Sequence, residues 1–310
     1  MIRVSLRRVD AAGAFFSLLA GICWGCSGSV GQYLFDHEGM DSRWLVPIRL
    51  GAAGIILLVY CAVREGHKIF HPWKTKQDRR DLLIYGLLGV SVCQYLYFLT
   101  IQLSTASAAT ILQDLSPMMI LIISCLQQKR LPQLREIAAV VLAFTGVLLI
   151  VTHGSLTHLN IPLNAVIAGV LSGVCVTIYN IVPARLLLKF PVILLQGWAF
   201  LMGGAAMCVI FRPWTFHYIP SQTGMLGILF VIAVGNVMAF PFYILGVKMI
   251  GPEKACLYGF SEPVSAAVIG VLVLGNPFTL WDLAGFICVF LMLAMISLKH
   301  RPANPAKRSR

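Results

Sequence analysis

Charged residues are scarce in this chain. They make up 12% of its 310 residues, whereas 58% are hydrophobic. Soluble globular proteins carry about 25% charged residues, so this composition excludes an ordinary soluble domain. The longest connection between apolar segments, 64–81, is too short to fold separately. The composition therefore predicts a polytopic membrane protein.

Motifs for nucleotide binding, redox chemistry and catalysis are also missing. No P-loop of the form G-x-x-x-x-G-K-[ST] is present, so ATP is not expected as a direct energy source. All nine cysteines fall in apolar segments and are expected to be buried thiols. Cys23 and Cys26 form a C-x-x-C pair, but on a membrane helix without a βαβ context. No histidine lies deep in an apolar segment, and no convergent catalytic cluster is evident. We therefore expect neither an enzyme nor a cofactor or metal.

Ten apolar segments are long enough to be interpreted as membrane-spanning helices. They cover 11–34, 44–63, 82–103, 106–126, 134–151, 163–187, 191–211, 226–250, 255–274 and 280–298. The first follows basic residues, as a signal peptide does, but it is long and further segments follow, so an uncleaved helix is expected. The predicted fold is an all-α integral membrane protein with ten transmembrane helices.

The positions of Lys and Arg orient these segments. Of the 24 such residues, all but Arg43, Arg49 and Arg212 lie at the N-terminus, at the connections after the second, fourth, sixth and eighth segments, or in the tail. Because cytoplasmic loops are enriched in basic residues, both termini are expected in the cytoplasm. The same distribution explains the net charge of +12 without nucleic acid as a partner.

Two stretches of the chain resemble each other. With an offset of 146 residues Pro263 falls on Pro117, and no gap is needed around them. Each copy carries one carboxylate inside its apolar segment, Asp114 or Glu262. In the predicted topology the copies have opposite orientations, as in many transporters; a duplication that serves stability alone is the alternative. The predicted units are a first five-helix repeat, 1–156, a second, inverted repeat, 157–298, and a basic cytoplasmic tail, 299–310.

Three charged residues lie inside apolar segments, away from the ends: Arg49, Asp114 and Glu262. A charge at the centre of a membrane helix costs about 2.5–3.5 kcal/mol on insertion scales, so it usually has a partner or a function. Arg49 is either a structural ion pair or headgroup contact, or an anchor for a substrate carboxylate. The two carboxylates either hydrogen-bond neighbouring helices, or bind a substrate amine or couple transport to protons.

Polar and aromatic residues on several segments are candidates for a central cavity. Such a mixed lining suits small amphipathic molecules. Pro117 and Pro263 each remove a backbone hydrogen bond and are expected to bend their helices. The predicted substrate-binding or coupling residues are Trp24, Arg49, Tyr97, Asp114, Tyr179, Asn180, Asn236 and Glu262, and further lining candidates are Ser27, Gln94, Gln196, Trp198 and Tyr258.

Four stretches resemble motifs of the drug/metabolite transporter superfamily, EamA type. LLAGICWGCSGSV, with Trp24 and Gly25, resembles its tryptophan-glycine motif, and PIRLGAAGIILL resembles its proline and arginine pattern. STASAATILQDLSPMMILI resembles its small-residue run that ends in proline, and LYGFSEPVSAAVIGVLVLGN resembles its Glu-Pro pattern. The resemblance covers nearly the whole chain and implies a ten-helix carrier of small metabolites, often amino acids and often outward.

The chain departs from that pattern at two helix ends. Such proteins commonly have glutamate at the ends of the fourth and ninth helices, where this chain has Lys129 or Arg130 and Asn276. No role of those glutamates is therefore carried over. The sequence predicts a secondary active transporter that works by alternating access as a monomer or homodimer. The resemblance implies that it is an exporter of small organic metabolites such as amino acids and that it lies in the cytoplasmic (inner) membrane. A membrane-embedded solute sensor and a multispan membrane enzyme are the alternatives, and no charged ring or pore motif favours a channel.

Overall fold

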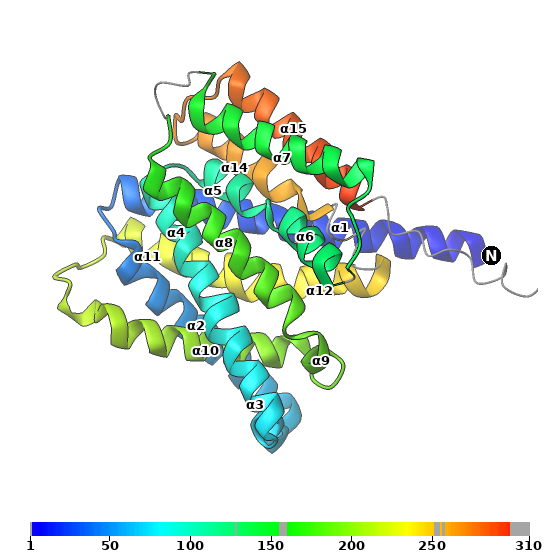
Figure 1. The fold of residues 1–310 in the computed structure, drawn as a ribbon. Helices are drawn as coiled ribbons and strands as arrows, with labels where there is room; N and C mark the ends of the chain where they lie inside the picture. The colour runs from blue at the N-terminus through cyan, green and yellow to red at the C-terminus, as the bar shows by residue number, and fades with distance from the viewer. Residues whose placement is uncertain (1, 128, 155–159, 251–254, 256–257, 298–310) are drawn as a thin grey trace, which may run out of the picture.

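The computed structural model describes residues 2–127, 129–154, 160–250, 255 and 258–297. Every regular element in these ranges is a helix (Figure 1), which confirms the predicted all-α class. The elements up to residue 152 are α1 (Ile2–Asp36), α2 (Ser42–Glu65), η1 (Gly66–Trp73), α3 (Lys76–Leu83), η2 (Ile84–Ser91), α4 (Val92–Leu103), α5 (Ala106–Gln113), α6 (Ser116–Gln127) and α7 (Leu134–Thr152). Those from residue 163 are α8 (Leu163–Ile181), α9 (Ala184–Leu187), α10 (Val192–Phe211), η3 (Pro213–Thr215), α11 (Gln222–Phe230), η4 (Val231–Met238), α12 (Ala239–Ile250), α14 (Ser261–Leu272) and α15 (Leu280–Ser297).

Eight helices of the described ranges are long and apolar enough to cross a membrane. Several of them combine successive elements, such as Lys76–Leu103 and Gln222–Ile250. The ninth and tenth predicted segments correspond to two shorter apolar helices, Ser261–Leu272 and Leu280–Met295. Residues 256–257 of the ninth segment and the predicted tail 299–310 lie outside the described residues.

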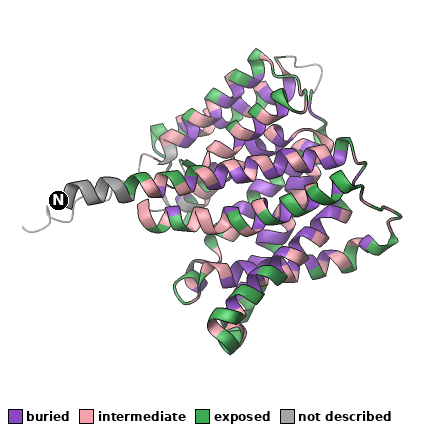
Figure 2. Ribbon diagram, turned by 180° about the vertical axis from the view of Figure 1, so that it is seen from behind, coloured by how far each residue is buried: buried purple, intermediate pink, exposed green. Residues whose placement is uncertain are grey.

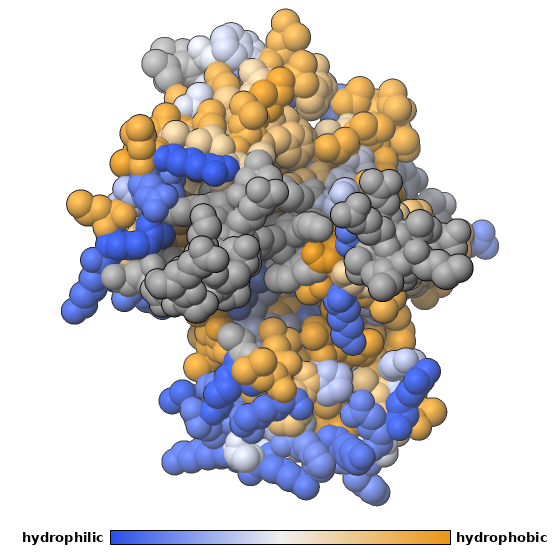
Figure 3. Space-filling view, turned by 90° about the vertical axis from the view of Figure 1, so that its right-hand side faces the viewer, coloured by the Kyte–Doolittle hydropathy of each residue, from blue (hydrophilic) through white to orange (hydrophobic). Residues whose placement is uncertain are grey.

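The surface carries apolar side chains over most of the helix length. Figure 2 shows exposed residues along the outer faces of the helices and buried ones on their inner faces. Large apolar side chains such as Ile55, Val59, Phe144 and Val209 are among those exposed. Many hydrophilic side chains gather at the lower end of the molecule in Figure 3, where Figure 1 places α3. Apolar side chains along the outer faces of the helices are the surface that a bilayer requires, because lipid cannot solvate polar groups.

The helices pack in pairs drawn from distant parts of the chain. α2 packs against α10, α1 against α12 and α14, α4 against α8, and α7 against α15. α1 crosses the middle of the molecule (Figure 1), and it approaches the start of α14 closely. A Cβ atom added to Gly21 would lie 2.5 Å from the carbonyl oxygen of Gly259, and one added to Gly25 would lie 2.6 Å from that of Glu262. These small residues allow the close helix approach that brings α1 next to Glu262.

Two of the predicted spans are interrupted at corresponding positions. Asp114, after α5, has φ −69° and ψ 3°, and Phe260, before α14, has φ −65° and ψ 0°. Phe260 follows Asp114 by 146 residues, the offset found between the two sequence copies. Pro117 and Pro263 each lie three residues after the interruption. A proline has no N–H, so the carbonyl four residues before it loses its helical donor, which accounts for a break at each place.

Two π-helical segments, η2 and η4, also occupy corresponding places in the two halves. η4 begins 147 residues after η2. A π-helix has wider turns than an α-helix and is often found at functional sites. At Gly89 of η2 an added Cβ would lie 2.8 Å from Tyr179 Cβ, and at Gly235 of η4 it would lie 2.1 Å from Ser27 Oγ. Each π-segment therefore brings a glycine against a helix of the other half.

Candidate functional site

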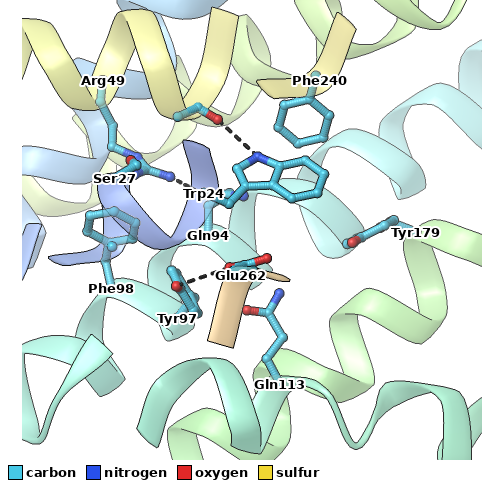
Figure 4. A pocket seen from close by; sticks show the side chains of 12 residues that line it. Trp24, Ser27, Arg49, Gln94, Tyr97, Phe98, Gln113, Tyr179, Phe240 and Glu262 are labelled. Atoms are coloured by element: carbon cyan, nitrogen blue, oxygen red, sulfur yellow. Dashed lines mark hydrogen bonds between the residues drawn. The ribbon is translucent and has the colours of Figure 1, made fainter. Parts of the chain in front are cut away.

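A cavity lies where α1, α2, α4, η4 and α14 meet (Figure 4). Its volume is about 80 Å³, which is room for several water molecules or a small polar group. Both halves of the chain contribute to it. The lining residues are Trp24, Ser27, Gly28, Arg49, Gln94, Tyr97, Phe98, Gln113, Tyr179, Gly235, Phe240 and Glu262. We call it the central cavity.

Arg49 supplies the positive charge of the central cavity. The residue is 3% exposed, and its Nη2 donates a hydrogen bond to Gln94 Oε1. Its guanidinium carbon lies 3.7 Å from the ring centroid of Phe98, a cation–π contact. Its Nε is buried without a hydrogen-bond partner. None of the ion pairs found between described residues includes Arg49, so it is a buried cation that lacks an anion there.

Glu262 supplies the negative charge. Its Oε1 accepts a hydrogen bond of 3.3 Å from Tyr97 Oη. Tyr97 Oη is also 3.3 Å from Thr110 Oγ1, and Thr110 donates to the carbonyl of Ala106 at 2.6 Å. The described ion pairs leave out Glu262 as well. Tyr97 and Thr110 therefore orient the carboxylate without neutralising it.

Aromatic rings form much of the remaining wall. Trp24 Nε1 donates a hydrogen bond of 3.1 Å to the carbonyl of Gly235 in η4. Its ring packs edge-to-face on Phe240, with the centroids 5.1 Å apart. In Figure 4 Arg49 and Phe98 lie at one end of the cavity and Tyr179 at the other, with Glu262 between them. The cavity thus presents opposite charges on an aromatic frame, and at about 80 Å³ it has room for a small polar group in this conformation.

The structure brings five of the eight predicted site residues to this cavity: Trp24, Arg49, Tyr97, Tyr179 and Glu262. Asp114 lies beside it at the helix break, and its Oδ2 is buried without a partner among the described residues. Asn236 is fully buried next to Gly235, and neither amide atom has a described partner. Asn180 is exposed and donates to the carbonyl of Val176 at 2.8 Å, so it turns away from the cavity.

The further lining candidates divide in the same way. Ser27 and Gln94 line the central cavity. Gln196 accepts a hydrogen bond from Tyr85 at 2.7 Å, Trp198 donates to the carbonyl of Ile69 at 2.9 Å, and Tyr258 is 41% exposed. None of these three reaches the central cavity.

Sequence reasoning missed five lining residues, namely Gly28, Phe98, Gln113, Gly235 and Phe240. For Phe98 a signal was available, because Gln94 and Phe98 are four residues apart and share one face of a helix. An amide and an aromatic ring on one face are a suitable contact for a buried guanidinium. Within the described residues, no group of three His, Cys, Asp or Glu side chains is placed to hold a metal ion.

Comparisons with known proteins agree with this architecture. The EamA-like transporter family matches residues 11–152 and again 163–298. The protein named "Uncharacterized inner membrane transporter YicL" of Salmonella typhimurium is 32% identical over 284 residues, which cover 92% of this chain and 94% of that protein. The "Uncharacterized transporter YrdR" of Bacillus subtilis is 23% identical over 306 residues, with 93% and 92% coverage. A crystal structure with 14% identity matches the fold with a TM-score of 0.62, over 94% of this chain and 97% of that one.

Proposed function

This chain belongs to the EamA-like transporter family, and we propose that it is a secondary active exporter of small zwitterionic metabolites such as amino acids. In this proposal the solute binds in the central cavity and crosses the cytoplasmic membrane by alternating access. The S. typhimurium relative, named as an inner membrane transporter, supports that location. The chain itself performs no covalent chemistry in this scheme.

The observation that carries the proposal is the unneutralised pair of charges in the central cavity. Arg49 and Glu262 face one cavity, and neither has an ionic partner among the described residues. A buried charge without a partner costs several kcal/mol, and it persists where function requires it. A zwitterion supplies both partners, because its carboxylate pairs with Arg49 and its ammonium with Glu262. The aromatic rings then contact its apolar part.

Alternating access is supported by the duplicated architecture. The family matches the chain twice, and the helix breaks at Asp114 and Phe260 have the same backbone conformation. Broken helices that meet near the middle of the membrane are a recurrent design of transporters with inverted repeats. In the proposal the halves 1–156 and 157–298 form ten spans with both termini in the cytoplasm. They rock about the central cavity, and bending is concentrated near Pro117 and Pro263.

Proton coupling is assigned to Glu262 in this scheme. The carboxylate receives a proton from one side when no substrate ammonium is present, and releases it when the ammonium arrives. Asp114 can influence that exchange, because its carboxylate interacts electrostatically with Glu262. The coupling therefore predicts an antiport of protons against a cationic or zwitterionic solute.

Uptake into proteoliposomes tests the proposal. Purified protein is assayed with a pooled panel of labelled amino acids and small metabolites, with and without a pH gradient. Saturable accumulation that responds to the gradient and is lost in Glu262→Gln supports a proton-coupled carrier. Glu65→Gln, a carboxylate at the end of α2 outside the central cavity, is the matched control and should transport normally. A folded protein that binds a panel member but moves none contradicts the transporter and favours a solute sensor.

A further inference from the structure

A second cavity, separate from the central cavity, also lies between the two halves. It is bounded by the junction of α4 and α5, the end of α7, the start of α8, the end of α14 and the start of α15. Its volume is about 270 Å³. Its lining includes Ser107, His153, Ala267 and Asp282. The predicted orientation places this second cavity at the outer end of the molecule.

The two cavities differ in what they can hold. Ligand pockets have volumes of roughly 300–1,000 Å³. The central cavity, at about 80 Å³, is well below that range, whereas the second cavity, at about 270 Å³, is close to its lower end. In the conformation described here, an amino-acid-sized solute fits the second cavity but not the central one.

The second cavity has a polar side that is held in place by hydrogen bonds. His153 Nε2 lies 2.9 Å from Asp282 Oδ1, and Asp282 Oδ2 accepts hydrogen bonds of 2.8 Å from both the backbone N–H and the hydroxyl of Thr279. Because Asp282 has only acceptors when ionised, the imidazole must donate to it. His153 also caps the C-terminus of α7 with φ 46°, a position that favours a cation. Ser107, in the first turn of α5, adds a hydroxyl to the same lining.

Apolar side chains also line the second cavity. They are those of Phe278, Phe286, Ile150 and Val271. Imidazole, hydroxyl and amide groups together with aromatic and aliphatic groups match a small amphipathic solute. This is the chemical class that the proposed function assigns to the central cavity.

Two short helices connect the cavities. On α5, Gln113 lines the central cavity, whereas Ser107 and Ala108 line the second. On α14, Glu262 lines the central cavity, whereas Ala267 and Val271 line the second. α5 and α14 pack against each other, and each adjoins one of the two helix breaks. A shift of these helices at their breaks would therefore change both cavities together.

We propose that the second cavity is a binding site for the transported solute, where a small amphipathic carboxylate is held on the outer side of the α5–α14 pair after it leaves the central cavity. The inference rests on the proposed function for the identity of the solute. That a site exists there is inferred from the volume and lining of the second cavity.

The first test reads occupancy of the second cavity without requiring transport. Ser107→Cys is made in the full chain, and intact cells are treated with a membrane-impermeant maleimide. Val268→Cys is the matched control, because Val268 lies on α14 beside the second cavity but faces outward, at 50% exposure. L-leucine at millimolar concentration is the probe, since it combines charged groups with a branched apolar side chain. We expect labelling of Ser107→Cys above that of wild type and Val268→Cys, and a severalfold slower rate with L-leucine.

The second test fills the cavity. Ala267 is 8% exposed and lines it, so Ala267→Phe places a ring in the space that the solute needs. We expect L-leucine flux in proteoliposomes to fall about tenfold or more, while Val268→Phe, one residue away and facing outward, transports as wild type does. Both variants should elute as folded protein in size-exclusion chromatography.

The outcomes separate this site from the proposed function. Wild-type flux with no protection of Ser107→Cys, or full flux in folded Ala267→Phe, overturns the second site and leaves the carrier standing. Protection without any wild-type flux supports the site and overturns the carrier. Failure of both protection and flux overturns both. A cysteine at position 107 that the maleimide does not reach from outside also overturns the placement of the site.

Discussion

Replacing Arg49 with methionine should stabilise the protein while abolishing transport. Arg49 is almost fully buried, and no described ion pair includes it. Methionine has a similar length and no charge, and it can pack on Phe98 where the guanidinium now lies. If Arg49 is kept for binding, its removal relieves an unfavourable burial. If it is kept for structure, its removal breaks the fold.

The expected change in the free energy of unfolding follows from one unfavourable and two favourable contributions of Arg49. Burial of an ion costs several kcal/mol after relaxation. The hydrogen bond to Gln94 returns about 1.5–3 kcal/mol, as hydrogen bonds to charged groups do, and the contact with Phe98 returns about 2 kcal/mol when desolvated. With methionine packing in its place, we expect a net gain of about 1–2 kcal/mol in the free energy of unfolding. That gain corresponds to a rise in apparent Tm of about 1–4 °C for a chain of this size.

Two assays on the same preparations distinguish a binding role of Arg49 from a structural one. Apparent Tm is measured in detergent without solute, at a fixed heating rate because unfolding of such proteins is often irreversible. Flux is measured in proteoliposomes with the solute that the panel identifies. Arg43→Met is the control, since the Arg43 side chain is 52% exposed and pairs with Asp41, and exposed pairs contribute about 0–1 kcal/mol. A clear fall in the Tm of Arg49→Met would refute the reasoning and assign Arg49 a structural role.

The remaining predictions concern stability and closure. Gly204→Val should lower apparent Tm by several degrees or prevent folding. A Cβ added to Gly204 would lie very close to the backbone nitrogen of Gly51, and backbone atoms cannot move aside as a flexible side chain can. Gly204→Ala should have a smaller effect of the same sign. In a double-mutant cycle, the losses in free energy of unfolding caused by Asp78→Asn and Lys189→Met should deviate from additivity by about 0.5–2 kcal/mol. The reason is that Asp78 is 2% exposed and accepts a hydrogen bond of 3.0 Å from Lys189. Additive losses would show that this contact does not stabilise the fold. Asp282→Asn should lower the free energy of unfolding by about 1–3 kcal/mol. It should also speed maleimide labelling of Ser107→Cys. Unchanged labelling would show that Asp282 does not shape the second cavity.

Sequence reasoning found the residues whose physical chemistry is unusual for their surroundings. Arg49 and Glu262 could be identified because a charge inside an apolar segment is rare. Pro117 and Pro263 indicated bending because a proline removes a helical hydrogen bond wherever the helix lies. The family resemblance rested on the same motifs, and the match to the EamA-like family over 11–152 and 163–298 confirms it.

Residues whose role depends on which way a helix faces could not be found in this way. Asn180 and Asn236 look alike in the sequence, yet one is exposed and the other fully buried. Phe98 is one of 17 phenylalanines; its spacing from Gln94 places the two on one helix face, but only the structure shows that this face meets Arg49. The π-segments shift the helical phase within α-helical patterns, so cavity faces downstream of them cannot be assigned by counting in steps of 3.6. His153 ends a helix, and its pairing with Asp282 on α15 is a tertiary contact that no local pattern predicts.

The close pairing of α7 with α15 also bears on how the protein is made. Gly146 and Gly285 pack so closely that a Cβ on either would lie within 3 Å of the other's carbonyl oxygen. More than a hundred residues separate the end of α7 from the start of α15, which at 5–20 residues per second is a delay of roughly 6–25 s during synthesis. During that interval the face of α7 that carries Gly146 contacts lipid or a chaperone instead of α15. The second cavity, walled by both helices, therefore comes into existence only after α15 has been synthesised.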